Sequence, residues 1–105
     1  MASDALDTEA AEATWPQPVV HDPDPETGAV RVTLAMPIER KGREPRGEVT
    51  IRRLRGEDMR ATSSKRGEDR TYELTIRAGG LLPSELDAMD IADLLAVTGV
   101  VDGFF

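Results

Sequence analysis

The chain has 105 residues, a formal net charge of −7 and no cysteine. This length leaves room for one small domain, and the lack of cysteine excludes disulfides and thiolate metal sites. The sequence opens without a positively charged start and apolar run, and no stretch approaches membrane-spanning length, so we expect neither a secretory signal nor a membrane helix. We therefore expect a soluble protein of the cytoplasm.

Charge divides the chain into three parts. Residues 1–28 hold seven acidic and no basic side chains, residues 29–66 hold five acidic and eleven basic ones, and residues 67–105 hold eight acidic and two basic ones. Four prolines interrupt the first part, so we predict a disordered acidic arm over residues 1–28 and one domain over residues 29–105. For Trp15 in this arm, packing on the domain is favoured over docking to a partner.

An antiparallel hairpin is predicted at the start of the domain. From Val30, apolar and polar residues alternate, which is typical of a half-buried strand. Pro37 is expected to end this strand because proline cannot donate to a sheet ladder. A charged turn over residues 39–47 leads to a second alternating run over residues 48–54. Such a hairpin is unstable alone, so another part of the chain must cover its apolar face.

Short helices are predicted to follow the hairpin. Residues 57–63 have acidic side chains in their first turn, where the helix dipole favours them, and residues 63–69 read as a polar loop. Residues 70–78 alternate like a strand but contain helix-favouring residues, so both structures stay open. The predicted fold class is α+β, with the acidic arm and the hairpin followed by two to four short helices.

Two helix-start signals lie near the end of the chain. Ser84 with Asp87 approximates a capping box, and Asp90 is expected to cap the final helix. On helical spacing, the apolar residues of that helix gather on one side: Ile91, Leu94, Leu95, Val101 and Phe105, with Val97 and Phe104 beside them. Asp93 and Asp102 fall on the opposite side. Packing of this helix on the hairpin and binding of its last turns to another protein both remain open.

Several pieces of the chain together carry a family resemblance. Leu34–Ile38 has the pattern Leu-x-x-Pro-Ile, residues 49–59 form an arginine-rich strand end, and Leu81–Leu86 leads into an apolar helix over Asp90–Phe105. In this order, over residues 29–105, the chain resembles the tail assembly chaperones of Mu-like and P2-like contractile-tailed phages. The resemblance implies a helix in the segment where strand and helix are both open.

The resemblance also implies a function that is not enzymatic. Such chaperones hold the tape measure protein soluble until tail tube subunits polymerise around it, and they act in the host cytoplasm and are absent from the mature virion. The tape measure protein is thus the expected partner, with the tail tube protein as a second one. An apolar terminal helix could cover apolar stripes on a long helical partner. The expected contact residues are Leu94, Leu95, Val97, Val101, Phe104 and Phe105.

Two further expectations concern the product itself. A hairpin with short helices leaves apolar surface uncovered, so we predict a homo-oligomer. The resemblance also implies a longer product made by ribosomal frameshifting, for which codons of Gly103–Phe105 could provide the slippery site. A structural role is the more common reason for terminal phenylalanines.

Two other classes of function are weighed against this one. A nucleic-acid-binding or regulatory protein would use the arginines of the hairpin region: Arg43, Arg46, Arg52, Arg53 and Arg55. Glutamates interleave with these arginines and no aromatic residue lies among them to stack on bases, so a solvated hairpin is favoured. For an enzyme, His21 is the only histidine, and a turn-forming role is favoured for its segment over catalysis or metal binding. No catalytic residue, metal ligand or cofactor is predicted.

Overall fold

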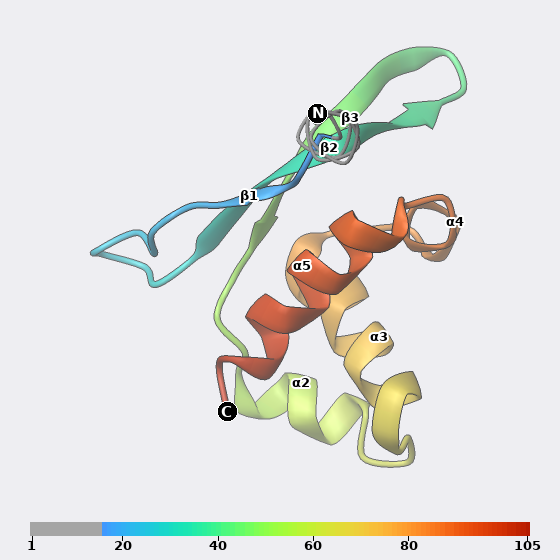
Figure 1. The fold of residues 1–105 in the computed structure, drawn as a ribbon. Coiled ribbons are helices and arrows are strands. Elements are labelled where there is room, and N and C mark those ends of the chain that lie inside the picture. The colour runs from blue at the N-terminus through green and yellow to red at the C-terminus, as the bar shows by residue number, and fades with distance from the viewer. Residues whose placement is uncertain (1–15) are drawn as a thin grey trace, which may run out of the picture.

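The structure, a computed structural model, describes residues 16–105 (Figure 1). Within them, a three-stranded antiparallel sheet precedes four helices, which confirms the predicted α+β class. The sheet has the order β1-β2-β3, with strands β1 (Val19–Val20), β2 (Val30–Arg40) and β3 (Arg43–Ile51). The helices are α2 (Gly56–Ala61), α3 (Gly67–Gly79), α4 (Pro83–Asp87) and α5 (Ile91–Asp102). The predictions for residues 1–15, including Trp15, lie outside the described residues.

The predicted hairpin is formed by β2 and β3. Val30 pairs with Ile51 and Val32 with Val49, and all four side chains are buried. Both strands extend further toward the turn than predicted, because a two-residue turn replaces the expected charged loop. Gly42 in this turn has a φ of 72°, a conformation that glycine adopts without steric cost.

Pro37 does not end β2, contrary to the prediction. Its side chain is exposed, and the register between β2 and β3 shifts between Thr33 and Ile38. In this irregular stretch, the N–H groups of Ala35 and Met36 donate to a carboxylate of α5. A proline at such an irregularity removes no ladder hydrogen bond, so the strand continues through it.

Strand β1 lies in the segment that the sequence assigns to the acidic arm. Val19 pairs with Thr33 and Val20 pairs with Val32, which adds a third strand at the edge of the hairpin. A pair of strand residues is too short to show an alternating pattern. The sequence therefore contained no periodic signal for this strand.

The connection between β1 and β2 folds into a turn around Asp24. Its Oδ1 accepts hydrogen bonds from the backbone N–H groups of Glu26 at 2.7 Å and Thr27 at 3.1 Å, and these bonds lower the pKa of Asp24. His21 precedes the turn, and its Nε2 lies 2.7 Å from Oγ1 of Thr33. The turn-forming role predicted for this segment is confirmed.

The ambiguous segment 70–78 belongs to helix α3. Leu74 and Ala78, one turn apart, are buried, and the helix ends at Gly79, where Gly80 caps it with a φ of 61°. Because α3 packs against both α5 and β3, its apolar residues are covered on more than one face. This two-sided burial produced the alternation that imitated a strand. Helix α2 lies close to the predicted range 57–63.

The two helix-start signals near the end of the chain have different outcomes. The predicted box of Ser84 and Asp87 is wrong, because α4 begins one residue before Ser84. The carboxylate of Glu85 instead accepts a hydrogen bond of 2.8 Å from the N–H of Leu82. Asp90 caps α5 as predicted, and its side chain accepts a bond of 3.0 Å from the N–H two residues later.

One hydrophobic core joins the sheet to the helices, which lie together on one side of the sheet (Figure 1). Its buried residues come from both long strands and from the segment after α2: Val30, Val32, Leu34, Ile38, Val49, Ile51, Leu74, Ala78, Leu81, Leu86, Met89, Val97 and Val101. The apolar face of the hairpin is thus covered by the chain's own helices, as its instability alone requires.

Candidate partner-binding groove

Helix α5 faces the core differently from the prediction. Asp93, Val97 and Val101, at intervals of one turn, are fully buried, whereas Ile91 and Leu95 are each 64% exposed. Asp93 was expected on the side away from the apolar residues, and this expectation is wrong. Its carboxylate can be buried because two backbone N–H groups of β2 donate hydrogen bonds to it, at 2.8 and 3.0 Å.

The six predicted contact residues lie in three different environments. Val97 and Val101 fill the core, so their side chains are inaccessible to a partner in this structure. Leu94 is half-buried and Leu95 is exposed, and both line a groove between α3 and α5. Of the last two residues, Phe104 is half-buried and Phe105 is 71% exposed. The structure thus leaves part of the predicted set, chiefly Leu94, Leu95 and Phe105, open to another molecule.

The groove has one wall from each of two helices. Helix α3 contributes Gly67, Glu68, Thr71 and Tyr72, and helix α5 contributes Ile91, Leu94, Leu95, Thr98 and Asp102. The apolar members of the two walls face a common hollow. Sequence reasoning missed Tyr72 as a site residue because its segment could not be assigned to a helix, and only a helix places it beside α5.

Hydroxyl groups near the groove are satisfied within their own helices. The buried Thr75 donates a hydrogen bond of 2.7 Å to the carbonyl of Thr71, and Thr98 donates one of 2.8 Å to the carbonyl of Leu94. Each bond spans one helical turn, so neither hydroxyl needs a partner from the other helix. The two helices can therefore pack together through apolar contacts.

Phe104 lies outside the groove, on the opposite side of the end of α5. It lines a separate hollow with Val20 and Val30 of the sheet, and the guanidinium of Arg53 lies 5.3 Å from the centre of its ring. The two terminal phenylalanines therefore have different surroundings. Phe104 packs on its own domain, whereas Phe105 does not.

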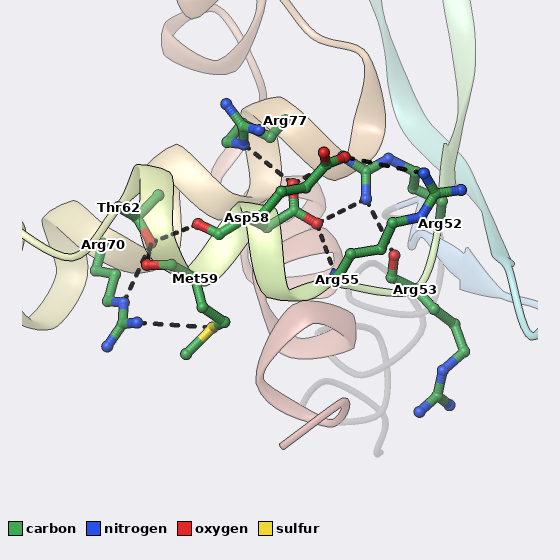
Figure 2. A network of polar contacts seen from close by, with 9 residues as sticks. Arg52, Arg53, Arg55, Asp58, Met59, Thr62, Arg70 and Arg77 are labelled. Atoms are coloured by element: carbon green, nitrogen blue, oxygen red, sulfur yellow. Dashed lines mark hydrogen bonds and ion pairs between the residues drawn. The ribbon is translucent and has the colours of Figure 1, made fainter.

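One of the arginines considered for nucleic-acid binding, Arg52, belongs to a network of ion pairs around a buried carboxylate (Figure 2). The carboxylate of Asp58 is fully buried and accepts two hydrogen bonds from Arg52, at 2.8 and 2.9 Å, and one of 3.0 Å from Arg77. The backbone N–H of Arg55 adds a bond of 2.8 Å. These bonds, chiefly those from Arg52, hold the pKa of Asp58 well below its usual range. The network joins the end of β3 to α2 and α3.

Other members of this arginine set also make contacts within the protein. Arg46 donates to the carbonyls of Gly79 at 3.0 Å and Gly80 at 3.2 Å, at the end of α3, and pairs with Glu85 of α4 at 3.3 Å. Arg55 lies 3.9 Å from Glu57 in an exposed pair, and Arg53 covers Phe104. Arg43 is exposed in the hairpin. The set is thus spread over several structural contacts, which weakens the nucleic-acid interpretation.

The sequence model of the family described as "Phage tail assembly chaperone proteins, E, or 41 or 14" matches residues 31–105. The chain belongs to this family. The match covers nearly all of the hairpin, the four helices and both walls of the groove, and it leaves β1 outside. It confirms the tail assembly chaperone family predicted above, while the link to Mu-like and P2-like phages stays a prediction.

The remaining comparisons add no further relative. The tail assembly chaperone matches none of the curated proteins and none of the solved structures with which it was compared. No helix within residues 16–105 combines the length and the apolar character that crossing a bilayer requires. Membership of a tail assembly chaperone family directs the search for partners to phage tail proteins.

Proposed function

We propose that this chaperone binds the tape measure protein and keeps it soluble in the host cytoplasm while the tail tube polymerises, without catalysing a reaction. The observation that supports the proposal best is the exposure of Ile91 and Leu95, each 64%, on a helix beside an apolar groove. Neighbouring exposed apolar side chains of this kind mark surfaces that bind another molecule. A family that assists tail assembly supplies the class of partner.

The shape of the groove suits a helical partner. Its walls are α3 and α5, and a third helix with apolar residues at intervals of three and four could lie between them. Burying a leucine or isoleucine side chain in such a contact contributes about 1.5–3 kcal/mol. Phe105, which is 71% exposed, could extend the contact beyond the end of α5. These contacts are non-covalent and reversible, as a transient chaperone requires.

Co-expression with the cognate tape measure protein tests the proposal. We expect the wild-type chaperone to keep the tape measure protein soluble and to co-purify with it. The double variant Ile91→Gln/Leu95→Gln should reduce the co-purified amount by at least about tenfold, since two buried apolar contacts are lost. Leu82→Gln is the matched control, because Leu82 is 61% exposed and lies outside this groove. Unchanged co-purification by the double variant would place the contact elsewhere.

The end of the chain requires point variants rather than truncation. Deleting residues 99–105 would remove Val101 from the core and so would confuse unfolding with loss of binding. Phe105→Ala changes only an exposed side chain and tests the terminal contact separately. A reduced co-purified amount assigns Phe105 to the interface, and an unchanged amount removes it from the predicted set.

We also propose that the chaperone self-associates and that the tail tube protein is a second partner. Val19, Val20 and Met36 of the sheet are each 51% exposed, so apolar side chains outside the groove are also available for a second contact. Sedimentation over a range of concentrations tests self-association, and a monomer at the highest concentration contradicts it. Co-purification of the tail tube protein alone tests the second partner.

A further inference from the structure

We infer that the groove between α3 and α5 selects an amphipathic helix whose apolar stripe is flanked by lysine or arginine. This inference rests on the proposed function, because it states which kind of tape measure segment the chaperone would hold. The observation that supports it is the charge of the groove: among the described residues, the charged side chains that line it, Glu68 and Asp102, are both acidic.

The groove combines an apolar surface with a carboxylate on each wall. Tyr72, Leu94 and Leu95 provide apolar surface, and they are joined by Glu68 of α3 and Asp102 of α5. Among residues 16–105, no lysine or arginine lines the groove. A helix lying there would place its apolar residues against the leucines and its flanking side chains near the two carboxylates. Cationic flanks would be attracted, and anionic flanks would be repelled.

The surroundings do not neutralise these carboxylates with cations from the same helices. Residues 79–105 contain no lysine or arginine, so α4 and α5 are purely acidic. Helix α3 has two arginines, and both are directed to other groups. Arg77 donates to Asp58 at 3.0 Å, and Arg70 lies 3.3 Å from Oγ1 of Thr62. The side chains that line the groove therefore carry a net negative charge.

The same charge argues against a second copy of the chaperone as the occupant of the groove. Within residues 16–105, the helix that exposes the largest apolar side chains is α5 itself, with Ile91 and Leu95. Two copies joined through this helix would bring carboxylates of equal sign together. Eleven of the thirteen basic residues lie instead in the hairpin region and near α2, which present no exposed apolar helical stripe within residues 16–105. A separate basic amphipathic partner fits the groove better.

Synthetic peptides and the full-length chaperone can test this inference. The probes are helix-forming peptides of about 20 residues with one leucine stripe, flanked by lysine, glutamine or glutamate. We expect the lysine peptide to bind at least about tenfold more tightly than the glutamate peptide in about 50 mM NaCl, and this preference should shrink in about 500 mM NaCl. Equal affinity of the lysine and glutamate peptides would overturn the inference.

Charge variants of the chaperone test whether the preference for the lysine peptide comes from the groove. Glu68→Gln/Asp102→Asn should weaken the lysine peptide about three- to tenfold and leave the glutamine peptide unchanged, since exposed ion pairs contribute modestly. Glu39→Gln/Glu44→Gln changes the net charge equally but alters exposed hairpin residues outside the groove, so it should have little effect. If both double variants weaken the peptide equally, attraction comes from the overall charge and the groove has no such selectivity.

Further measurements separate this inference from the proposed function. If the tape measure protein co-purifies with wild type and with Glu68→Gln/Asp102→Asn equally, the selectivity is wrong and the proposed function stands. If the lysine peptide binds as expected but the tape measure protein does not, the proposed function is wrong and the groove chemistry stands. If Ile91→Gln/Leu95→Gln abolishes self-association while peptide binding persists, a second copy occupies the groove and the inference is overturned.

Discussion

The carboxylate of Asp93 in α5 accepts a hydrogen bond of 3.0 Å from the backbone N–H of Met36 in β2, 57 residues earlier in the chain. The neighbouring N–H of Ala35 donates a second bond of 2.8 Å to the same carboxylate. These bonds set the rotation of α5 about its axis. With Asp93 against the sheet, Val97 and Val101 follow it into the core, and Leu95 turns toward the groove.

Asp93→Asn should therefore destabilise the fold. The amide keeps one acceptor oxygen but places an NH₂ group against the second backbone N–H, which leaves a buried donor unsatisfied. We expect a loss of about 2 kcal/mol in the free energy of unfolding, measured by urea denaturation. Asp90→Asn serves as the control, since asparagine caps a helix about as well as aspartate. A loss as large for Asp90→Asn as for Asp93→Asn would contradict the role given to the buried bonds.

Removal of the Asp58 carboxylate should cost more. Asp58→Ala leaves the guanidinium groups of Arg52 and Arg77 without their common acceptor, although each arginine side chain is about one-third exposed (35% and 34%) and can reach water. We expect the free energy of unfolding to fall by about 3 kcal/mol, which is at the lower end of the cost of breaking a buried ion pair. Glu57→Gln, in the exposed pair with Arg55, should cost less than about 0.5 kcal/mol. Chemical denaturation of both variants makes the comparison.

Stability should fall in acid through the same carboxylate. Because the folded state holds the pKa of Asp58 below its ordinary value of 3.8, its stabilisation is complete above that value and is lost as pH falls below it toward the folded pKa. Between about pH 5 and about pH 3, Asp58 should account for a loss of about 1 kcal/mol. Asp58→Asn should show a correspondingly weaker pH dependence in urea titrations. An identical dependence in wild type and variant would exclude this linkage.

Substitution by alanine should change the stability of the fold in opposite directions at two glycines. A Cβ on Gly79 would lie 3.1 Å from side-chain carbons of both Ile51 and Val49 in the core. We expect Gly79→Ala to destabilise the chaperone by about 1–2 kcal/mol through overpacking. Gly99 lies within α5, and a Cβ there would meet nothing within 4 Å, so Gly99→Ala should stabilise by about 0.5–1 kcal/mol. Thermal and urea unfolding of both variants would show the opposite signs.

The candidate site was predictable only in part. Leu94 and Leu95 followed from the apolar pattern of the last helix and do line the groove. Val97 and Val101 have the same chemical character, and nothing local distinguishes a core valine from a contact residue. Tyr72 required the helix in residues 70–78 to be known first. The opposite wall of the groove could therefore not be inferred from the chain alone.

The sequence by itself determined those features of this protein that depend on the geometry of neighbouring residues. The alternation after Val30 predicts a strand because side chains alternate across a pleated backbone, and Asp90 predicts a helix start because its carboxylate reaches a nearby N–H group. The family also followed from the order and spacing of short sequence elements. The strand and cap signals each act over a few residues, whereas the family signal needs only their order along the chain.

Only the tertiary structure decided which residues stay exposed. A carboxylate favours water, so the sequence pattern predicted an exposed Asp93. In the structure Asp93 is buried, because two backbone N–H groups of β2 donate hydrogen bonds to it. That contact turns α5, buries Val97 and leaves Leu95 open. Strand β1 likewise exists only through its pairing with β2. Such contacts join residues far apart in the chain, and no local periodicity records them.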